Sequence, residues 1–185
     1  MPRLETPPRA RILAAAHVEF AASGLSGARI DAIAREAHAS KERLYAHFAT
    51  KRELFDATLA ESVERWSTAI PFDADDLPSW AARLYDHLAR HPDDGRLLLW
   101  AQIEGAAAPS PGVADLEQLE ARRQAVRAAQ EAGHVGSDWS PDELTTLVLG
   151  VVLAWFVTPS GSNLHQGPHE RRTEIVRQAV ARLVA

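Results

Sequence analysis

The segment between Ser40 and Lys51 carries the side chains best suited to chemistry with a nucleic acid. Leu44 and Phe48 stand four residues apart, so they would bury one face of a short helix. The residues left outward are mostly cationic or able to form hydrogen bonds, as phosphates and base edges require. These outward residues are Lys41, Glu42, Arg43, Tyr45, Ala46 and His47. The segment predicts a helix that reads DNA, although any solvated helix face could look similar.

A second short helix is expected directly before this one. Four apolar residues there keep the spacing of a helix with one buried face. They are Ile30, Ile33, Ala34 and Ala37. In a helix-turn-helix the second helix lies in the major groove of DNA and the first crosses the phosphate backbone. We predict such a motif, with helices over about 28–37 and 40–48, and a generic helical hairpin is the alternative.

Two of the outward residues have more than one interpretation. Glu42 could accept a hydrogen bond from cytosine N4, or it could repel nonspecific DNA. Tyr45 could reach a phosphate through its hydroxyl, or it could pack at the edge of the core beside Leu44 and Phe48. The residues alone leave both alternatives open.

The charge of the chain is unevenly distributed. The 185 residues carry a net charge of −5, which by itself argues against a nucleic-acid partner. Up to Arg52, nine Lys and Arg residues stand against five acids, a net +4, whereas eleven basic and twenty acidic residues follow, a net −9. DNA binding requires positive charge at the phosphates rather than over the whole protein. The distribution therefore predicts a DNA-facing head on an acidic body.

Composition limits the other classes of protein. With 46% hydrophobic residues the chain can bury a substantial core, and its length suits one domain or a small domain fused to a larger one. The absence of cysteine excludes disulfides and thiolate metal sites. The start is too polar and proline-rich for a signal peptide, and the longest apolar run, Leu147 to Val157, is shorter than the roughly 18 residues of a membrane span. We expect a soluble, cytoplasmic protein with no membrane partner.

The fold is expected to be all-α, with about nine helices. A first helix over about 9–23 should end at Gly24. Thr50 and Glu53 form a capping-box signature that opens a long helix over about 51–69. Ser140, Pro141 and Glu143 repeat that signature further along the chain.

Two domains are predicted on this basis. A helix-turn-helix DNA-binding domain would occupy residues 1–52, and a helical ligand-binding and dimerisation domain would occupy residues 53–185. The long helix over about 51–69 would join them.

Aromatic residues in the body suggest where a small molecule would bind. The chain has five tryptophans, which could line an apolar pocket or simply fill the core. Trp100 and Glu104 lie one helical turn apart, which would place a carboxylate beside a flat apolar wall and suit a cationic or hydroxylated ligand. The candidate ligand-binding residues are Trp66, Tyr85, Trp100, Glu104 and Trp155. We expect no cofactor and no metal, because His87 and His91 lack a third ligand on their face.

The last two predicted helices, over about 142–157 and 169–184, have apolar faces broader than a lone amphipathic helix needs. Paired with their copies in a second subunit, they would form a four-helix interface about a two-fold axis. Burial inside the monomer is the alternative. We expect a homodimer.

The head resembles the DNA-binding domain of TetR-family transcriptional regulators over about residues 9–66. The matching features are the ending of the first helix from Phe20 to Gly24, Asp31-Ala-Ile-Ala34, Ala37-x-x-Ser40-Lys41, Leu44-Tyr45-x-His47-Phe48 and Lys51-x-x-Leu54. Beyond the head, only the number and order of helices look similar. The resemblance implies a dimer on a palindromic DNA operator and a helical body that holds an inducer.

The resemblance also implies roles for individual residues. By position, Arg29, Tyr45, His47 and Lys51 would contact phosphates, whereas Lys41, Glu42, Arg43 and Ala46 would face bases and Ser40 would cap the recognition helix. The chain departs from the family at two positions. His38 replaces the usual turn glycine, so a left-handed conformation there would be strained. Ala28 replaces the usual threonine, which removes a cap from the second helix.

The sequence thus favours a ligand-responsive DNA-binding regulator, most simply a repressor released by a small, largely apolar effector. A helical enzyme acting on a small molecule is one alternative, but no nucleophile with a convincing acid or base partner is evident. A DNA-binding dimer without a ligand is the other, with tryptophan side chains filling the body. The residues identify neither the effector nor the operator.

Overall fold

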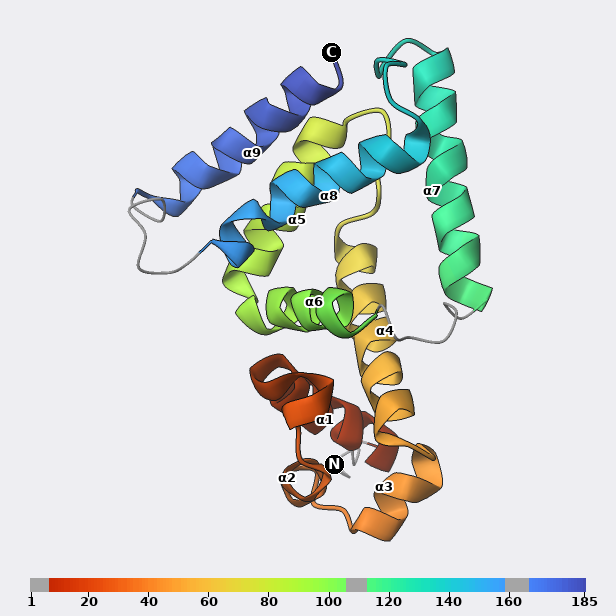
Figure 1. Ribbon diagram of the computed structural model, residues 1–185, viewed down its shortest axis with the longest axis vertical. Coiled ribbons are helices and arrows are strands. Elements are labelled where there is room, and N and C mark those ends of the chain that lie inside the picture. Colours follow the sequence, from red (N-terminus) through yellow and green to blue (C-terminus); the bar gives the residue numbers. More distant parts are fainter. Residues whose placement is uncertain (1–6, 106–112, 159–166) are drawn as a thin grey trace, which may run out of the picture. The chain divides into compact units, whose positions relative to one another are not determined.

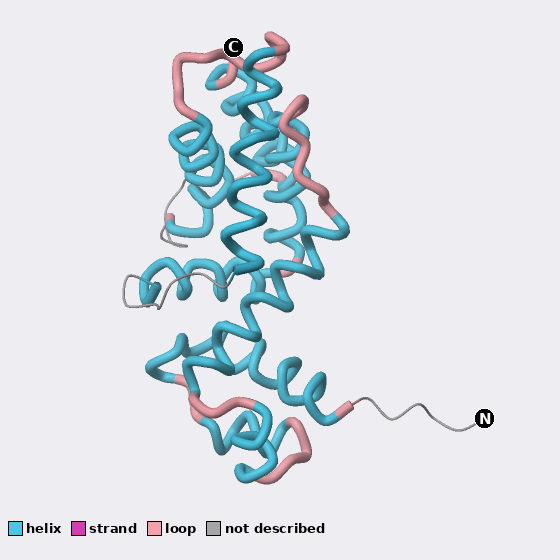
Figure 2. The backbone as a smooth tube through the Cα atoms, turned by 90° about the vertical axis from the view of Figure 1, so that its right-hand side faces the viewer, coloured by secondary structure: helices cyan, strands magenta, loops and turns pink. Residues whose placement is uncertain are grey.

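The computed structural model describes residues 7–105, 113–158 and 167–185, and these residues form helices and connecting loops without any strand (Figure 2). The all-α prediction, with about nine helices, is confirmed for this part of the chain. The helices are α1 (Pro8–Gly27), α2 (Ile30–Glu36), α3 (Lys41–His47), α4 (Lys51–Ala69), α5 (Leu77–Arg90), α6 (Pro92–Gly105), α7 (Val113–Glu131), α8 (Pro141–Val157) and α9 (His169–Leu183) (Figure 1). No helix of the described residues is long and apolar enough to cross a membrane.

The chain divides into two compact units. One comprises Met1–Trp66 and His91–Ala108, and the other comprises Ser67–Arg90 and Pro109–Ala185. The first unit therefore contains α6 together with the helices of the predicted head.

The first unit is built on a core that α1, α2, α3, α4 and α6 share. Ile12, Phe20, Ile33, Leu44 and Leu54 are fully buried in it. The rings of Phe20 and Phe55 meet edge to face, with centroids 5.1 Å apart. Leu97 of α6 also belongs to this core. The apolar face predicted for the helix-turn-helix is thus buried.

The second unit packs α5 against both α8 and α9, and α7 against α8, as Figure 1 shows within that unit. The apolar face of α5 is buried through Leu77, Trp80, Leu84, Tyr85 and Leu88. The inner face of α8 is buried through Leu144, Val148, Val152 and Leu153, and that of α9 through Val176 and Val180.

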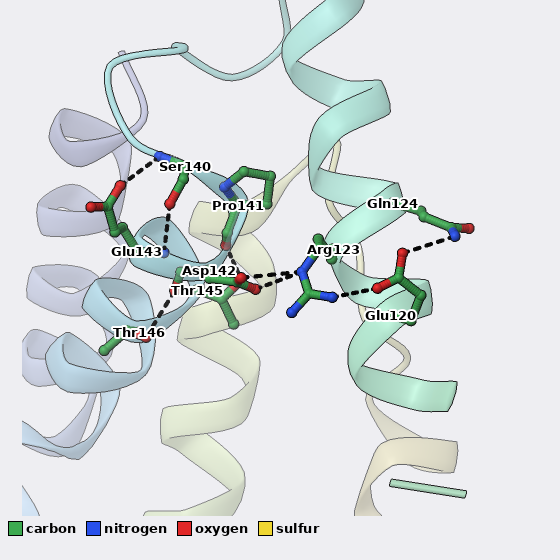
Figure 3. A network of polar contacts seen from close by, with 9 residues as sticks. All are labelled: Glu120, Arg123, Gln124, Ser140, Pro141, Asp142, Glu143, Thr145 and Thr146. Carbon is green, nitrogen blue, oxygen red and sulfur yellow. Dashed lines mark hydrogen bonds and ion pairs between the residues drawn. The ribbon is translucent and has the colours of Figure 1, made fainter. Parts of the chain in front are cut away.

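Local signals fix the ends of several helices. Gly24, expected to stop the first helix, has φ +66° and breaks the helical conformation, but the helical segment resumes as far as Gly27. The capping box of α8 is complete, because Ser140 Oγ accepts from Glu143 N at 3.3 Å and the Glu143 carboxylate accepts from Ser140 N at 2.8 Å (Figure 3). Arg123 of α7 donates to the Asp142 carboxylate at 3.0 and 3.1 Å, which ties α7 to the first turn of α8.

Candidate DNA-binding surface

The outer face of α3 is open to solvent. Leu44 and Phe48 are 0% and 2% exposed, so they anchor the helix in the core of the first unit. Every candidate residue on the helix and at its cap is exposed. These residues are Ser40, Lys41, Glu42, Arg43, Tyr45, Ala46 and His47. Tyr45, with 46% exposure, lies on this outer face rather than in the core.

Side-chain caps hold both ends of the segment around α3. Ser40 Oγ accepts from Arg43 N at 3.2 Å, as a helix N-cap does. Thr50 Oγ1 accepts from Glu53 N at 3.0 Å in the same way at the start of α4. The Glu53 carboxylate accepts from Ala49 N at 2.7 Å, one residue earlier than the predicted box requires.

The turn between α2 and α3 contains a strained residue. His38 has φ 50°, and it is the one described non-glycine residue with a positive φ. The left-handed conformation expected at this position is therefore present. The turn closes through hydrogen bonds from His38 N to Arg35 O at 3.2 Å and from Ala39 N to Ala34 O at 2.9 Å.

The cations of the surface are engaged to different degrees. Lys41 Nζ lies 2.5 Å from the Asp31 carboxylate, and both side chains are more than half exposed. Lys51 Nζ donates to Ser26 O at 3.1 Å. Arg43 has no ion pair among the residues that the structure describes, so its guanidinium is available to a base edge. Exposed ion pairs of the Lys41 kind are weak, and DNA can displace them.

Glu42 is ionised at neutral pH. Its own backbone N–H, and then the Ser40 hydroxyl, hold the pKa of the Glu42 carboxyl below its ordinary value. A carboxylate in this position can accept from cytosine N4 but would repel a nearby phosphate. Glu42 therefore presents a negative charge on the outer face of α3.

Two residues of α1 contact the helix-turn-helix segment and were not evident from sequence. Arg9 of α1 places its guanidinium carbon 5.4 Å from the ring centroid of Phe48. The Glu19 carboxylate of α1 accepts from Arg29 N at 2.8 Å, so it holds the start of α2. Arg29 itself is exposed and is the N-cap residue of α2, one position after the Ala28 where the sequence predicts a lost cap, and its side chain makes no capping hydrogen bond.

The buried carboxylate of Asp94, near the start of α6, connects this helix to α1 and α4. Asp94 is 5% exposed. Its Oδ1 lies 2.7 Å from His17 Nε2 and accepts from Ser62 Oγ, also at 2.7 Å. Arg65 adds a longer contact of 3.5 Å to the same oxygen. The Asp94 partners His17 on α1 and Ser62 on α4 lie 77 and 32 residues away along the chain, so no local sequence signal could identify them.

The carboxylate of Glu104, near the end of α6, makes a second connection to α1. Glu104 accepts from Leu25 N at 2.9 Å and from Ser26 N at 3.3 Å, directly after the break at Gly24. The Trp100 ring lies against Gly24, where an added Cβ would approach it to 2.8 Å. Trp100 and Glu104 are thus neighbours, as their spacing predicts, but both are engaged with α1.

The other ligand candidates lie in different places. In the second unit, the Tyr85 ring lies 5.8 Å from Trp155 and is stacked on His169 at 5.7 Å, measured between centroids. Burial raises the pKa of the Tyr85 hydroxyl. Trp66 is buried at the end of the first unit. The structure therefore brings Tyr85 and Trp155 together and groups Trp100 with Glu104.

A helix-turn-helix with an exposed recognition face, fused to a helical body, defines a class of DNA-binding transcriptional regulators. Known proteins place the chain within that class. Residues 12–58 match the family described as bacterial regulatory proteins, tetR family, and residues 76–182 match the tetracyclin repressor-like C-terminal domain. The chain belongs to the TetR family of transcriptional regulators.

Individual relatives span nearly the whole chain. The HTH-type transcriptional repressor SCO4008 of Streptomyces coelicolor is 35% identical over 173 residues, which cover 93% of this chain and 90% of that protein. The regulator candidate SCO4942, also from Streptomyces coelicolor, has a crystal structure with a TM-score of 0.81 and 30% identity, covering 96% of this chain and 98% of its own. AibR, solved with isovaleryl coenzyme A and operator DNA, shares the fold at a TM-score of 0.71 and 15% identity, covering 94% and 98% of the two chains.

Proposed function

We propose that the chain is a ligand-responsive repressor that binds a palindromic DNA operator as a homodimer and is released by a small, largely apolar effector. The exposed outer face of α3, held in place by buried Leu44 and Phe48, carries this proposal. The relative SCO4008 is named a repressor, which supports repression rather than activation by this chain. Its DNA partner would place the protein in the cytoplasm.

The exposed residues of the head are proposed to have two different roles in DNA binding. Arg29, Tyr45, His47 and Lys51 are proposed to contact phosphates. Lys41, Glu42, Arg43 and Ala46 are proposed to face the bases, with Ser40 capping the helix. Arg43 is the strongest candidate for reading a base, because its guanidinium can pair with guanine O6 and N7. Lys41 must first leave Asp31, which an exposed ion pair allows at little cost.

Dimerisation is proposed through α8 and α9. The face of α8 opposite its buried side carries Leu147, Gly150, Ala154 and Val157, of which Leu147 and Val157 are 37% and 65% exposed. Such an apolar stripe suits contact with the same stripe of a second copy. A two-fold pair would space the two α3 helices by one turn of DNA, about 34–36 Å.

The effector is proposed to bind in the helical body over residues 53–185, with the DNA-binding domain over residues 1–52. Release follows if the effector prefers a conformation whose α3 spacing no longer fits the operator, a coupling of about 1–3 kcal/mol. The contacts of Asp94 and Glu104 with α1 support a role for α6 in holding the head during that change.

A paired substitution tests the proposed roles. Lys51→Ala should weaken binding to all duplexes alike and reduce the slope of log affinity against log salt by about 1. Arg43→Ala should instead reduce discrimination at one base position by about 1–3 kcal/mol. Arg127→Ala, on the exposed side of α7, is the control. If Arg43→Ala lowered affinity equally for every duplex, its proposed role in base reading would be wrong.

A DNA-binding dimer without an effector is the competing proposal. The burial of Trp66 and Trp80 favours it, because large side chains can fill a body completely. In that case no small molecule would raise the thermal stability of the protein. A screen of melting temperatures against apolar small molecules separates the two.

A further inference from the structure

Three side chains of the second unit form a cluster whose polar groups are all hydrogen-bond donors. The rings of Phe72 and Trp80 meet edge to face with centroids 4.9 Å apart. The guanidinium carbon of Arg122, on α7, lies 5.7 Å from the centroid of the same Phe72 ring. Phe72 precedes α5, and Trp80 lies in its first turns. We call this set the Phe72–Trp80–Arg122 cluster.

Neither donor has an acceptor among the described residues. Trp80 is 1% exposed, and its indole Nε1 is buried without a hydrogen-bond partner in that part of the chain. Buried donors are almost always paired in proteins, so an orphaned indole N–H requires an explanation. Arg122 likewise makes no ion pair within the described residues, and only the face of Phe72 offsets its charge.

Burial lowers the pKa of the Arg122 guanidinium, and no acid in the described segments of the chain opposes that shift. A partly desolvated cation without a counter-charge is unfavourable in a folded protein. An unpaired, partly buried cation is therefore uncommon at a position where the side chain serves packing alone.

The acids closest in sequence to Phe72 are engaged elsewhere. The Asp73 carboxylate accepts from the backbone N–H groups of Asp75 and Asp76 at 3.2 Å each. Asp75 pairs with His134 at 2.8 Å, and Asp76 accepts from Ser79 N at 3.1 Å. These carboxylates shape the start of α5 and do not pair with Arg122.

We propose that the Phe72–Trp80–Arg122 cluster binds the anionic group of an organic acid with an apolar body. The guanidinium of Arg122 supplies a charge-assisted hydrogen bond to the carboxylate or sulfonate, and the indole N–H of Trp80 supplies a neutral one. The Phe72 ring contacts the apolar body of the ligand. This inference rests on the proposed ligand-responsive function, and it names the chemical class of the effector.

A matched pair of fluorescent probes tests the site directly. The probes are 8-anilinonaphthalene-1-sulfonate, an aromatic anion, and N-phenyl-1-naphthylamine, its uncharged counterpart. Titration of the full-length protein should give saturable binding that is at least tenfold tighter for the anion. Arg122→Met, which keeps an apolar stem, should remove that preference. It should weaken binding of the anionic probe at least tenfold and leave the affinity for the uncharged probe unchanged.

Two more variants complete the test. Trp80→Phe should weaken binding of the anionic probe several-fold, because an aromatic ring stays but the indole N–H donor is lost. Arg127→Met, on the exposed side of the same helix, should change neither probe. Arg122→Met should also leave the melting temperature unchanged or raised, because it removes a desolvated charge. A lowered melting temperature with unchanged anion binding would show that Arg122 serves packing, and the inference would be wrong.

The readouts separate this inference from the proposed function. Anion binding that depends on Arg122 supports the site even if no DNA is bound or released. Tighter binding of an aromatic cation such as crystal violet, strengthened by Arg122→Met, would overturn the anionic assignment. Release of a bound DNA duplex by the anion, lost in Arg122→Met, would support the site and the proposed function together.

Discussion

The Glu104 carboxylate exemplifies a single residue on which the geometry of the head depends. Its hydrogen bonds to Leu25 N and Ser26 N occupy two backbone donors at the point where Gly24 interrupts the helix. A backbone donor left unsatisfied in a partly buried position costs about 1–3 kcal/mol. The residue therefore contributes to the fold of the head rather than to solvation of the surface.

Glu104→Ala should lower the free energy of unfolding by about 1–3 kcal/mol, because both N–H groups lose their acceptor. Glu104→Gln should cost less, since an amide oxygen still accepts. Gln102→Ala, an exposed change on the same helix, should have little effect. Urea unfolding of the full chain measures all three, and equal losses for the Glu104 and Gln102 variants would contradict this role.

His38→Gly, in contrast, should raise the free energy of unfolding. The left-handed conformation of a non-glycine residue costs about 1–2 kcal/mol, so glycine should stabilise the protein by about 1 kcal/mol after its greater unfolded-state entropy is included. Ala39→Gly, one residue further along, should destabilise it. Thermal unfolding decides the matter, and a lower melting temperature for His38→Gly would remove the argument for strain in the turn.

Some residue contacts could be predicted from sequence and others could not. The burial of Leu44 and Phe48 follows from short-range spacing, whereas the cap at Ser40 and the left-handed His38 follow from the resemblance of the head to TetR-family DNA-binding domains. The partners of Asp94 and Glu104 lie 77 to 79 residues away along the chain, at His17 and Leu25. Local patterns cannot identify such partners, because they depend on which helix faces meet.

At the scale of elements, the start of α8 depends on a carboxylate. The Ser140 side chain, and then its backbone N–H, lower the pKa of Glu143 from its ordinary value of 4.5. A group whose pKa is lower in the folded state adds stability above the unfolded-state value and loses it as the pH falls through the folded-state value. The capping box is therefore a source of acid sensitivity (Figure 3).

Glu143→Gln should reduce the loss of stability that the protein shows between about pH 5 and pH 3, because glutamine keeps an acceptor but does not titrate. At pH 7 the variant should be slightly less stable, because the charged acceptor is lost. Melting temperatures across this range measure the slope. Identical pH profiles for the two proteins would show that the Glu143 cap does not contribute.

The helices were more predictable than their packing. The long helix expected over about 51–69 runs from Lys51 to Ala69. The capping box predicted at Ser140 is complete, whereas at Thr50 only the half from Glu53 N to Thr50 Oγ1 forms as predicted. Caps and apolar spacing are local, so they can be identified in one sequence. The packing of α6 on α1 is a property of surfaces far apart in the chain, and its sequence gave no sign of it.

For the whole molecule, the apolar stripe of α8 is the feature on which the proposed dimer depends. Gly150 is exposed, and a Cβ added there would meet no atom within 4 Å. A large side chain at this position can therefore be accommodated within one subunit. It would not fit between two closely packed copies.

Gly150→Arg should convert the dimer to a monomer and weaken operator binding, while the helical content stays the same. Ala128→Arg, an exposed change on α7, is the matched control for the added charge. Sedimentation equilibrium gives the mass directly. A dimer that persists in Gly150→Arg would place the subunit interface elsewhere.

The most direct test of the whole account is selection of the purified protein on a random duplex library at moderate salt, followed by sequencing of the bound fraction. Wild type should enrich a palindrome with half-sites one helical turn apart, and Arg43→Ala should change the preferred bases within each half-site. Enrichment of no sequence, with no binding even at low salt, would contradict the assignment of α3 as a recognition helix.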